Sequence, residues 1–75
     1  MSQKMDLAKE IAVLEKEMHE LECKRARSMA ALMEALISRK EPDETEMQYF
    51  RQYTAEIDVK RDKLIELTKR LQSII

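Results

Sequence analysis

The chain has 75 residues, 39% of them charged and none glycine, so it lacks the turn chemistry of sheet architectures and is predicted to be all-α. Its formal net charge of −1 excludes the long-range attraction of a basic domain to nucleic acid. No apolar run approaches the ~20 residues of a membrane span, so we expect no membrane insertion. The single Cys23 cannot form an intrachain disulfide, and the N-terminal MSQKMDLAKE contains no apolar signal-peptide core; we therefore expect a cytoplasmic protein.

A helix over residues 4–40 is the first predicted element. Its first half carries apolar residues spaced alternately three and four apart, as in the seam of a coiled coil. Arg25 takes the next seam position, and we expect the apolar line to resume at Met29 after a stutter, which unwinds a supercoil locally. The predicted seam comprises Leu7, Ile11, Leu14, Met18, Leu21, Met29, Leu32 and Leu36.

The segment from Ala26 to Ile37 is unusually apolar for so charged a chain. Nine of its twelve residues are apolar, and on a helix they face every side. One neighbouring helix buries a stripe of such a helix but not its whole circumference. We therefore predict that part of this segment is an interaction surface.

A turn is predicted at residues 41–43. Pro42 disfavours helical geometry at Glu41 and has no N–H to donate inside a helix. Asp43 is a good N-cap, and Glu46 three residues later completes a pattern typical of a capping box. So short a connection predicts an antiparallel two-helix hairpin, coiled-coil-like and forming a single domain over residues 1–75. Because two helices share little core, we expect oligomerisation or a partner to complete it.

A second helix is predicted over residues 43–74, with a heptad seam that only Lys60 interrupts. Lys60 and Arg25 both fall in the seam near the middle of the hairpin. They either snorkel, with their stems in the seam and their charges in water, or they pair with acidic residues. The apolar seam residues are Phe50, Tyr53, Ile57, Leu64, Leu67, Leu71 and Ile74, and the available acids are Glu22, Asp58 and Asp62.

No catalytic, cofactor-binding or metal-binding residues are predicted. Enzymes need a pocket with positioned polar groups, usually on loops, and this chain has almost no loop and no glycine-rich phosphate cradle. Glu15, His19 and Cys23 share one helical face, but a structural metal site requires four ligands. Basic residues alternate with acidic ones, which indicates a mixed solvated face rather than a nucleic-acid site.

The strongest functional prediction is a protein-binding surface near the turn, where methionines adapt to a partner and alanines allow close helix approach. Its occupant is either a dedicated helical partner or a second copy, in which case two hairpins form a four-helix scaffold or regulator. The predicted partner-binding residues are Met29, Ala30, Met33, Ile37, Met47, Tyr49, Phe50 and Tyr53.

The length, the hairpin, the charged turn, Asp43 and then Gln48-Tyr49 opening an amphipathic helix resemble a bacterial family over residues Leu14 to Leu71. These are the small co-chaperones of type III secretion needle subunits. In that family a helical hairpin pairs with a tetratricopeptide-like chaperone, and the pair holds the needle subunit unpolymerised in the cytoplasm. The resemblance implies a cytosolic co-chaperone or adaptor whose partner is a helical chaperone or secretion subunit.

Overall fold

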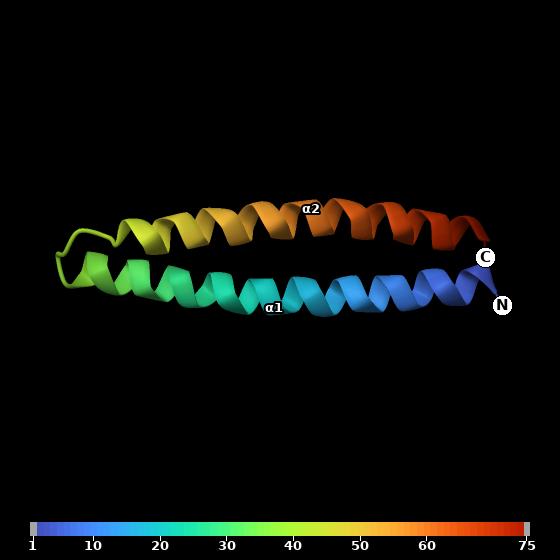
Figure 1. The fold of residues 1–75 in the computed structure, drawn as a ribbon, viewed down its shortest axis with the longest axis horizontal. Coiled ribbons are helices and arrows are strands. Elements are labelled where there is room, and N and C mark those ends of the chain that lie inside the picture. Colours follow the sequence, from blue (N-terminus) through green and yellow to red (C-terminus); the bar gives the residue numbers. More distant parts are fainter. Residues whose placement is uncertain (1, 75) are drawn as a thin grey trace.

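The computed structural model describes residues 2–74, which form two long helices joined by a short loop (Figure 1). Helix α1 spans Gln3–Ile37 and helix α2 spans Glu44–Ile74. The helices run antiparallel, so the start of α1 and the end of α2 lie at the same end of the hairpin, opposite the loop. This arrangement confirms the predicted all-α helical hairpin.

Helix α1 ends at Ile37, so the prediction that it continues to residue 40 is wrong. The Lys40 N–H donates to the Ala35 carbonyl over 2.8 Å, and the Arg39 N–H donates to the Leu36 carbonyl over 3.1 Å. Together with the left-handed backbone of Arg39 (φ 57°), these bonds form a Schellman motif. The motif reverses the chain before Pro42 is reached, which is why the helix is shorter than the proline alone indicates.

Replacing Arg39 with glycine is expected to stabilise the hairpin. A left-handed backbone strains arginine but not glycine, the residue most common at this position. We expect Arg39→Gly to raise the free energy of unfolding by about 0.5–1 kcal/mol, net of the greater freedom of glycine in the unfolded chain. Urea denaturation followed by circular dichroism measures this change. The control is Lys40→Gly, at a neighbour without a left-handed backbone; equal stability of the two variants would contradict the prediction.

Helix α2 begins with the predicted N-cap. The Thr45 N–H donates to Asp43 Oδ1 over 2.9 Å, and the Met47 N–H donates to the Asp43 carbonyl over 3.1 Å. The carboxylate thereby satisfies one of the N–H groups that the first turn of a helix leaves without an intrahelical partner. Helix α2 therefore starts at Glu44, directly after its N-cap Asp43.

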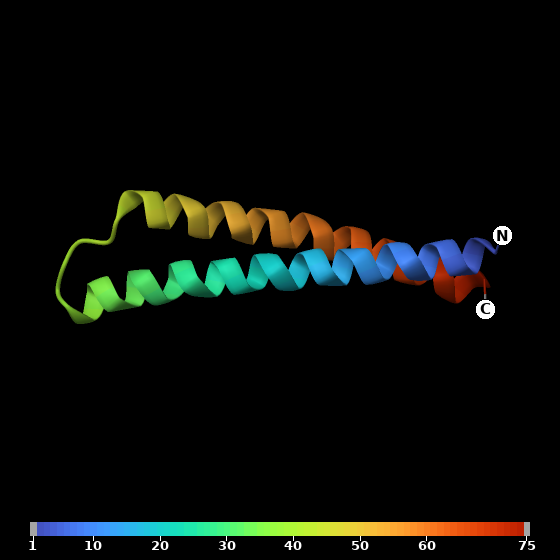
Figure 2. The ribbon, with the colours of Figure 1, turned by 60° about the horizontal axis from the view of Figure 1, so that its bottom comes forward.

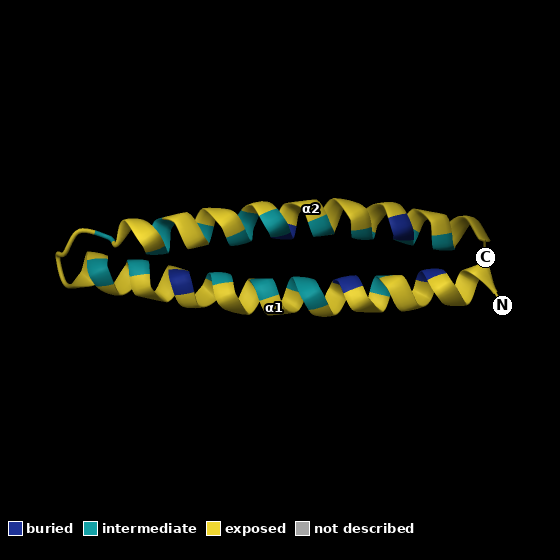
Figure 3. Cartoon of the chain, viewed as in Figure 1, coloured by how far each residue is buried: buried dark blue, intermediate teal, exposed yellow. Residues whose placement is uncertain are grey.

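The apolar core lies toward the chain ends. Leu7, Leu14 and Leu67 are buried there, and Ile57 in the middle of α2 has an exposed fraction of 0%. Figure 3 shows that the buried and half-buried residues line the facing sides of the two helices, while the outer sides are exposed. The partly buried residues that pack on the core are Ile11, Leu64 and Leu71.

The seam of α1 keeps its heptad spacing toward the loop, so the predicted stutter is wrong. After Arg25 the residues that face α2 are Ser28, which is buried, and Leu32 and Ala35, which are half-buried. Met29 and Leu36, both predicted in the seam, have exposed fractions of 41% and 66%. A regular heptad avoids the local unwinding that a stutter requires. It places Ser28 and Ala35 between the helices together with Leu32, and it leaves the larger Met29 and Leu36 outside.

The hairpin is too thin to enclose much interior. It measures 56 × 16 × 15 Å, and Figure 2 shows that its helices are inclined, diverging toward the loop and crossing near the chain ends in this view. Its accessible surface of 6017 Å² exceeds by roughly 1,200 Å² the area of about 4,800 Å² typical of a compact protein of 8.9 kDa. Within residues 2–74, neither helix contains a stretch apolar and long enough to cross a membrane.

Candidate protein-interaction surface

Four large apolar side chains near the loop project from α1 into solvent. We call Met29, Met33, Leu36 and Ile37 the loop-proximal surface; Met33 is 53% exposed and Ile37 80% exposed. Their spacing of four, three and one residues places them along one side of the helix. Ala26 and Ala30, also exposed, lie beside them. Exposed apolar side chains that cluster on one side of a monomer typically mark a contact with another protein.

The burial of Ser28 determines where these side chains lie. Successive residues of a helix are rotated by about 100°, so Arg27 and Met29 leave α1 on opposite sides of Ser28, which faces α2. Met33 follows Met29 by one turn and lies on the same side, whereas Lys24 lies on the side of Arg27. The hairpin therefore has two flanks along the seam, which we name the Met29 flank and the Tyr49 flank.

The Tyr49 flank takes its name from two aromatic residues of α2. Tyr49 and Tyr53 stack with their ring centroids 6.1 Å apart and an interplanar angle of 20°. Together with Ser28 and Glu46 they line a hollow of about 350 Å³, whose other lining residues are Lys24 and Arg27. These tyrosines therefore lie across the seam from Met29 and Met33.

The eight predicted partner-binding residues therefore do not form one continuous surface. Phe50 is half-buried and faces the seam, and Met47 leaves α2 on the side of Phe50 opposite Tyr49, toward the Met29 flank. The structure places Met29, Ala30, Met33 and Ile37 on exposed parts of α1, Met47 half-buried on α2, and Tyr49 and Tyr53 beside the hollow on the other flank. It also adds Leu36 to the exposed group. Counting regular heptads from Leu7 along the sequence would have identified Leu36 as exposed. That count places Ser28 and Ala35 in the seam, so Leu36 lies beside the seam and not in it.

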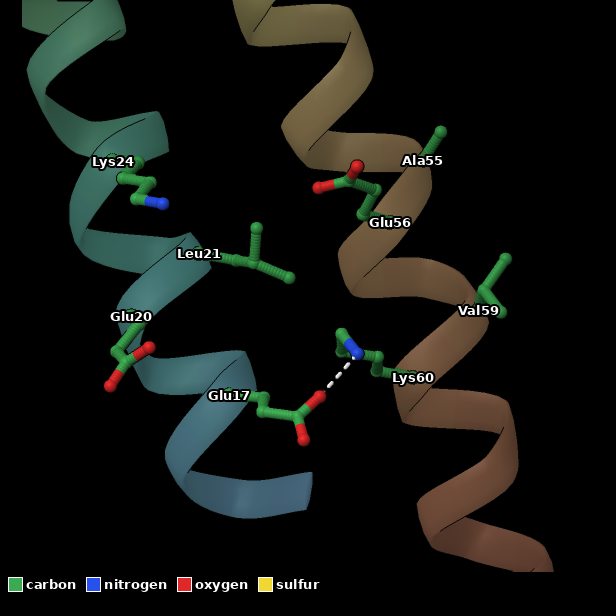
Figure 4. A pocket seen from close by; sticks show the side chains of 8 residues that line it. All are labelled: Glu17, Glu20, Leu21, Lys24, Ala55, Glu56, Val59 and Lys60. Atoms are coloured by element: carbon green, nitrogen blue, oxygen red, sulfur yellow. Dashed lines mark hydrogen bonds and ion pairs between the residues drawn. The ribbon is translucent and has the colours of Figure 1, made fainter. Parts of the chain in front are cut away.

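A second and larger hollow, of about 550 Å³, lies on the Tyr49 flank near the middle of the hairpin. Lys60 of α2 crosses toward α1 there, and its Nζ donates to Glu17 Oε2 over 2.6 Å (Figure 4). The other residues that line the hollow are Glu20, Leu21, Lys24, Ala55, Glu56 and Val59. Five of the eight lining residues are charged. An apolar partner that binds here would have to desolvate these charged groups, which opposes binding.

The seam lysine is both paired and partly solvated. The Lys60 side chain is 29% exposed, and its partner Glu17 is not among the three acids proposed from the sequence. Asp58, one of those three, pairs instead with Arg61 of its own helix over 3.2 Å. The three acids predicted to be available to the two seam cations do not include the partner of Lys60, because the register between the helices brings Glu17 opposite Lys60. Arg25 is half-buried, as its seam position predicts.

The potential metal ligands remain on the outer face of α1. His19 Nε2 and Cys23 Sγ are 3.7 Å apart, and both residues are exposed. Among residues 2–74, no group of three or more His, Cys, Asp or Glu side chains is arranged to hold a metal ion. Among the described residues, the loop-proximal surface brings together four exposed large apolar side chains. No family model, curated protein or solved structure matches the chain.

Proposed function

We propose that the chain is a non-enzymatic protein-interaction module, a cytosolic co-chaperone or adaptor that binds a helical partner through its loop-proximal surface. The observation that carries this proposal is the exposure of Met29, Met33, Leu36 and Ile37 along one side of α1. The hairpin leaves these side chains outside while placing Ser28 and Ala35 between its own helices. The larger apolar groups are thereby available to another protein.

The form of the surface suits a helix as the partner. Methionine side chains adapt to the shape of what they contact, and the adjacent Ala26 and Ala30 allow a second backbone to approach closely. An amphipathic helix that lies along a groove presents apolar residues at the same three- and four-residue spacing as the surface it contacts. Met47, which is half-buried on α2, adds an apolar residue on the same side of the seam as Met29.

The resemblance to the needle-subunit co-chaperones supports the same kind of role. A helical partner, either a chaperone or a secretion subunit, would be kept soluble by covering apolar surface on both proteins. Catalysis does not enter the proposal, because most of the charged pairs described lie within one helix on exposed surface, such as Arg70 with Glu66 over 2.6 Å.

The proposal predicts that one substitution on the loop-proximal surface abolishes partner capture. Tagged wild-type chain, Met33→Glu and Val59→Glu are expressed in the native host, and the captured proteins are identified and quantified by mass spectrometry. Val59 is a matched control because it is 68% exposed but lies on α2 outside the surface. We expect wild type and Val59→Glu to retain one helical protein in equimolar amounts, and Met33→Glu to retain at least about tenfold less.

Circular dichroism checks that both variants are folded, which their exposed positions favour. Equal capture of the same partner by Met33→Glu would contradict the proposed surface. Failure of both variants to bind, with wild type still binding, would show that added negative charge rather than this surface controls capture.

A further inference from the structure

We infer that a second copy of the chain covers the Met29 flank when no other partner is bound, giving a four-helix bundle with both loops at the same end. This inference rests on the proposed function because it concerns the same surface. It implies that binding of another helical protein competes with self-association.

The exposed area of the hairpin matches what a dimer requires. The chain has roughly 1,200 Å² more accessible surface than a compact protein of its mass. A standard stable interface buries about 800 Å² on each partner. If two copies associate along one flank, the area buried on each chain would bring its accessible surface close to that of a compact domain of the same mass.

The number of charged residues on each flank indicates that the Met29 flank is the one buried in the dimer. Residues seven apart on these helices occupy equivalent positions beside the seam. On α1 the positions equivalent to Met29 include Glu15, Glu22 and Leu36, and on α2 those equivalent to Met47 include Thr54, Arg61 and Thr68. This flank therefore carries three charged residues at its positions beside the seam. The equivalent positions of the Tyr49 flank carry six, namely Glu10, Glu17, Lys24, Glu56, Lys63 and Arg70. Burying the Met29 flank thus requires the smaller desolvation cost.

Charge complementarity indicates the orientation of the copies. A two-fold axis parallel to the hairpin places α1 of one copy against α2 of the other at the same height. The contact between Lys60 and Glu17 shows that Arg61 and Glu15 lie at similar heights on α2 and α1. Each Glu15 therefore comes near Arg61 of the second copy. The guanidinium of Arg61 has N–H donors for this carboxylate in addition to the one that pairs with Asp58 of its own helix. In the same arrangement Met29 comes near Met47. A two-fold axis perpendicular to the hairpin through the loop-proximal surface would leave Glu15 outside the contact.

The test measures the mass of the purified full chain by size-exclusion chromatography with light scattering, over a series of concentrations. We expect wild type and Val59→Glu to have twice the monomer mass of 8.9 kDa. The Met33→Glu dimer should dissociate at protein concentrations at least about tenfold higher than those at which the wild-type dimer dissociates. Glu15→Arg is expected to weaken the dimer about fivefold, and Arg61→Glu in the same chain to restore it. Glu10→Arg, on the Tyr49 flank, is the matched control and should have no effect.

Each contrary outcome has a separate meaning. A monomeric wild type would overturn the inference of self-association. The proposed binding of a different helical protein would still be open, because the capture experiment tests it independently. A dimer unaffected by Met33→Glu would show that the copies meet on another face. A dimer weakened by Met33→Glu but unaffected by Glu15→Arg would overturn the same-end orientation.

Discussion

Truncating Ile57 to alanine is expected to lower the free energy of unfolding by about 2–4 kcal/mol. Ile57 has no exposed surface, and the only other buried apolar residues described are Leu7, Leu14 and Leu67. Loss of its side chain leaves a cavity between two helices that have few other buried contacts to hold them together. The change is measured by urea denaturation followed by circular dichroism, at one fixed protein concentration because association contributes to stability.

The matched control is Val59→Ala on the same helix. Val59 is 68% exposed, so its truncation is expected to change the free energy of unfolding by no more than about 0.5 kcal/mol. Similar losses for the two variants would mean that Ile57 does not occupy the seam, and the facing sides of the helices would have to be reassigned.

Reversing the charge of Lys60 is expected to destabilise the hairpin by about 1–2 kcal/mol. Lys60→Glu would place a carboxylate beside Glu17, with Glu56 lining the same hollow, so attraction across the seam becomes repulsion. Adding Glu17→Lys to the same chain should restore most of the loss, because the exchanged residues again have opposite charge. The cost of Lys60→Glu should also decrease at high salt, which screens the partly exposed charges.

The control for this prediction is Arg70→Glu, which reverses a charge in the exposed pair with Glu66 within α2. Its expected cost is smaller, about 0.5 kcal/mol, because such pairs contribute little in water. If Glu17→Lys fails to rescue Lys60→Glu, the contact between these residues does not set the register of the hairpin.

The two flanks explain how one short chain remains a defined hairpin and still offers a binding surface. Opposite charges on the Tyr49 flank, including Lys60 and Glu17, favour one antiparallel register. The Met29 flank carries fewer charges and more apolar side chains, so it is the side on which another helix gains most. Polar and small residues in the loop half of the seam, such as Ser28 and Ala35, limit what the hairpin buries by itself.

The sequence by itself determined the helical hairpin and the start of α2. These features depend on local chemistry: the absence of glycine, the helical spacing of apolar residues, and the carboxylate of Asp43 beside the first N–H groups of α2. Near the loop it also identified an excess of apolar residues, because a charged chain with nine apolar residues in twelve has more than one helix can bury.

Only the tertiary structure decided which side of α1 faces α2. Ser28 and Met29 are equally compatible with a helix, and the choice between them depends on continuous packing against α2 along the whole seam. The same packing places Tyr49 and Met33 on different flanks and brings Glu17 to Lys60. Contacts between residues far apart in sequence depend on the register of the two helices, and no local pattern contains that register.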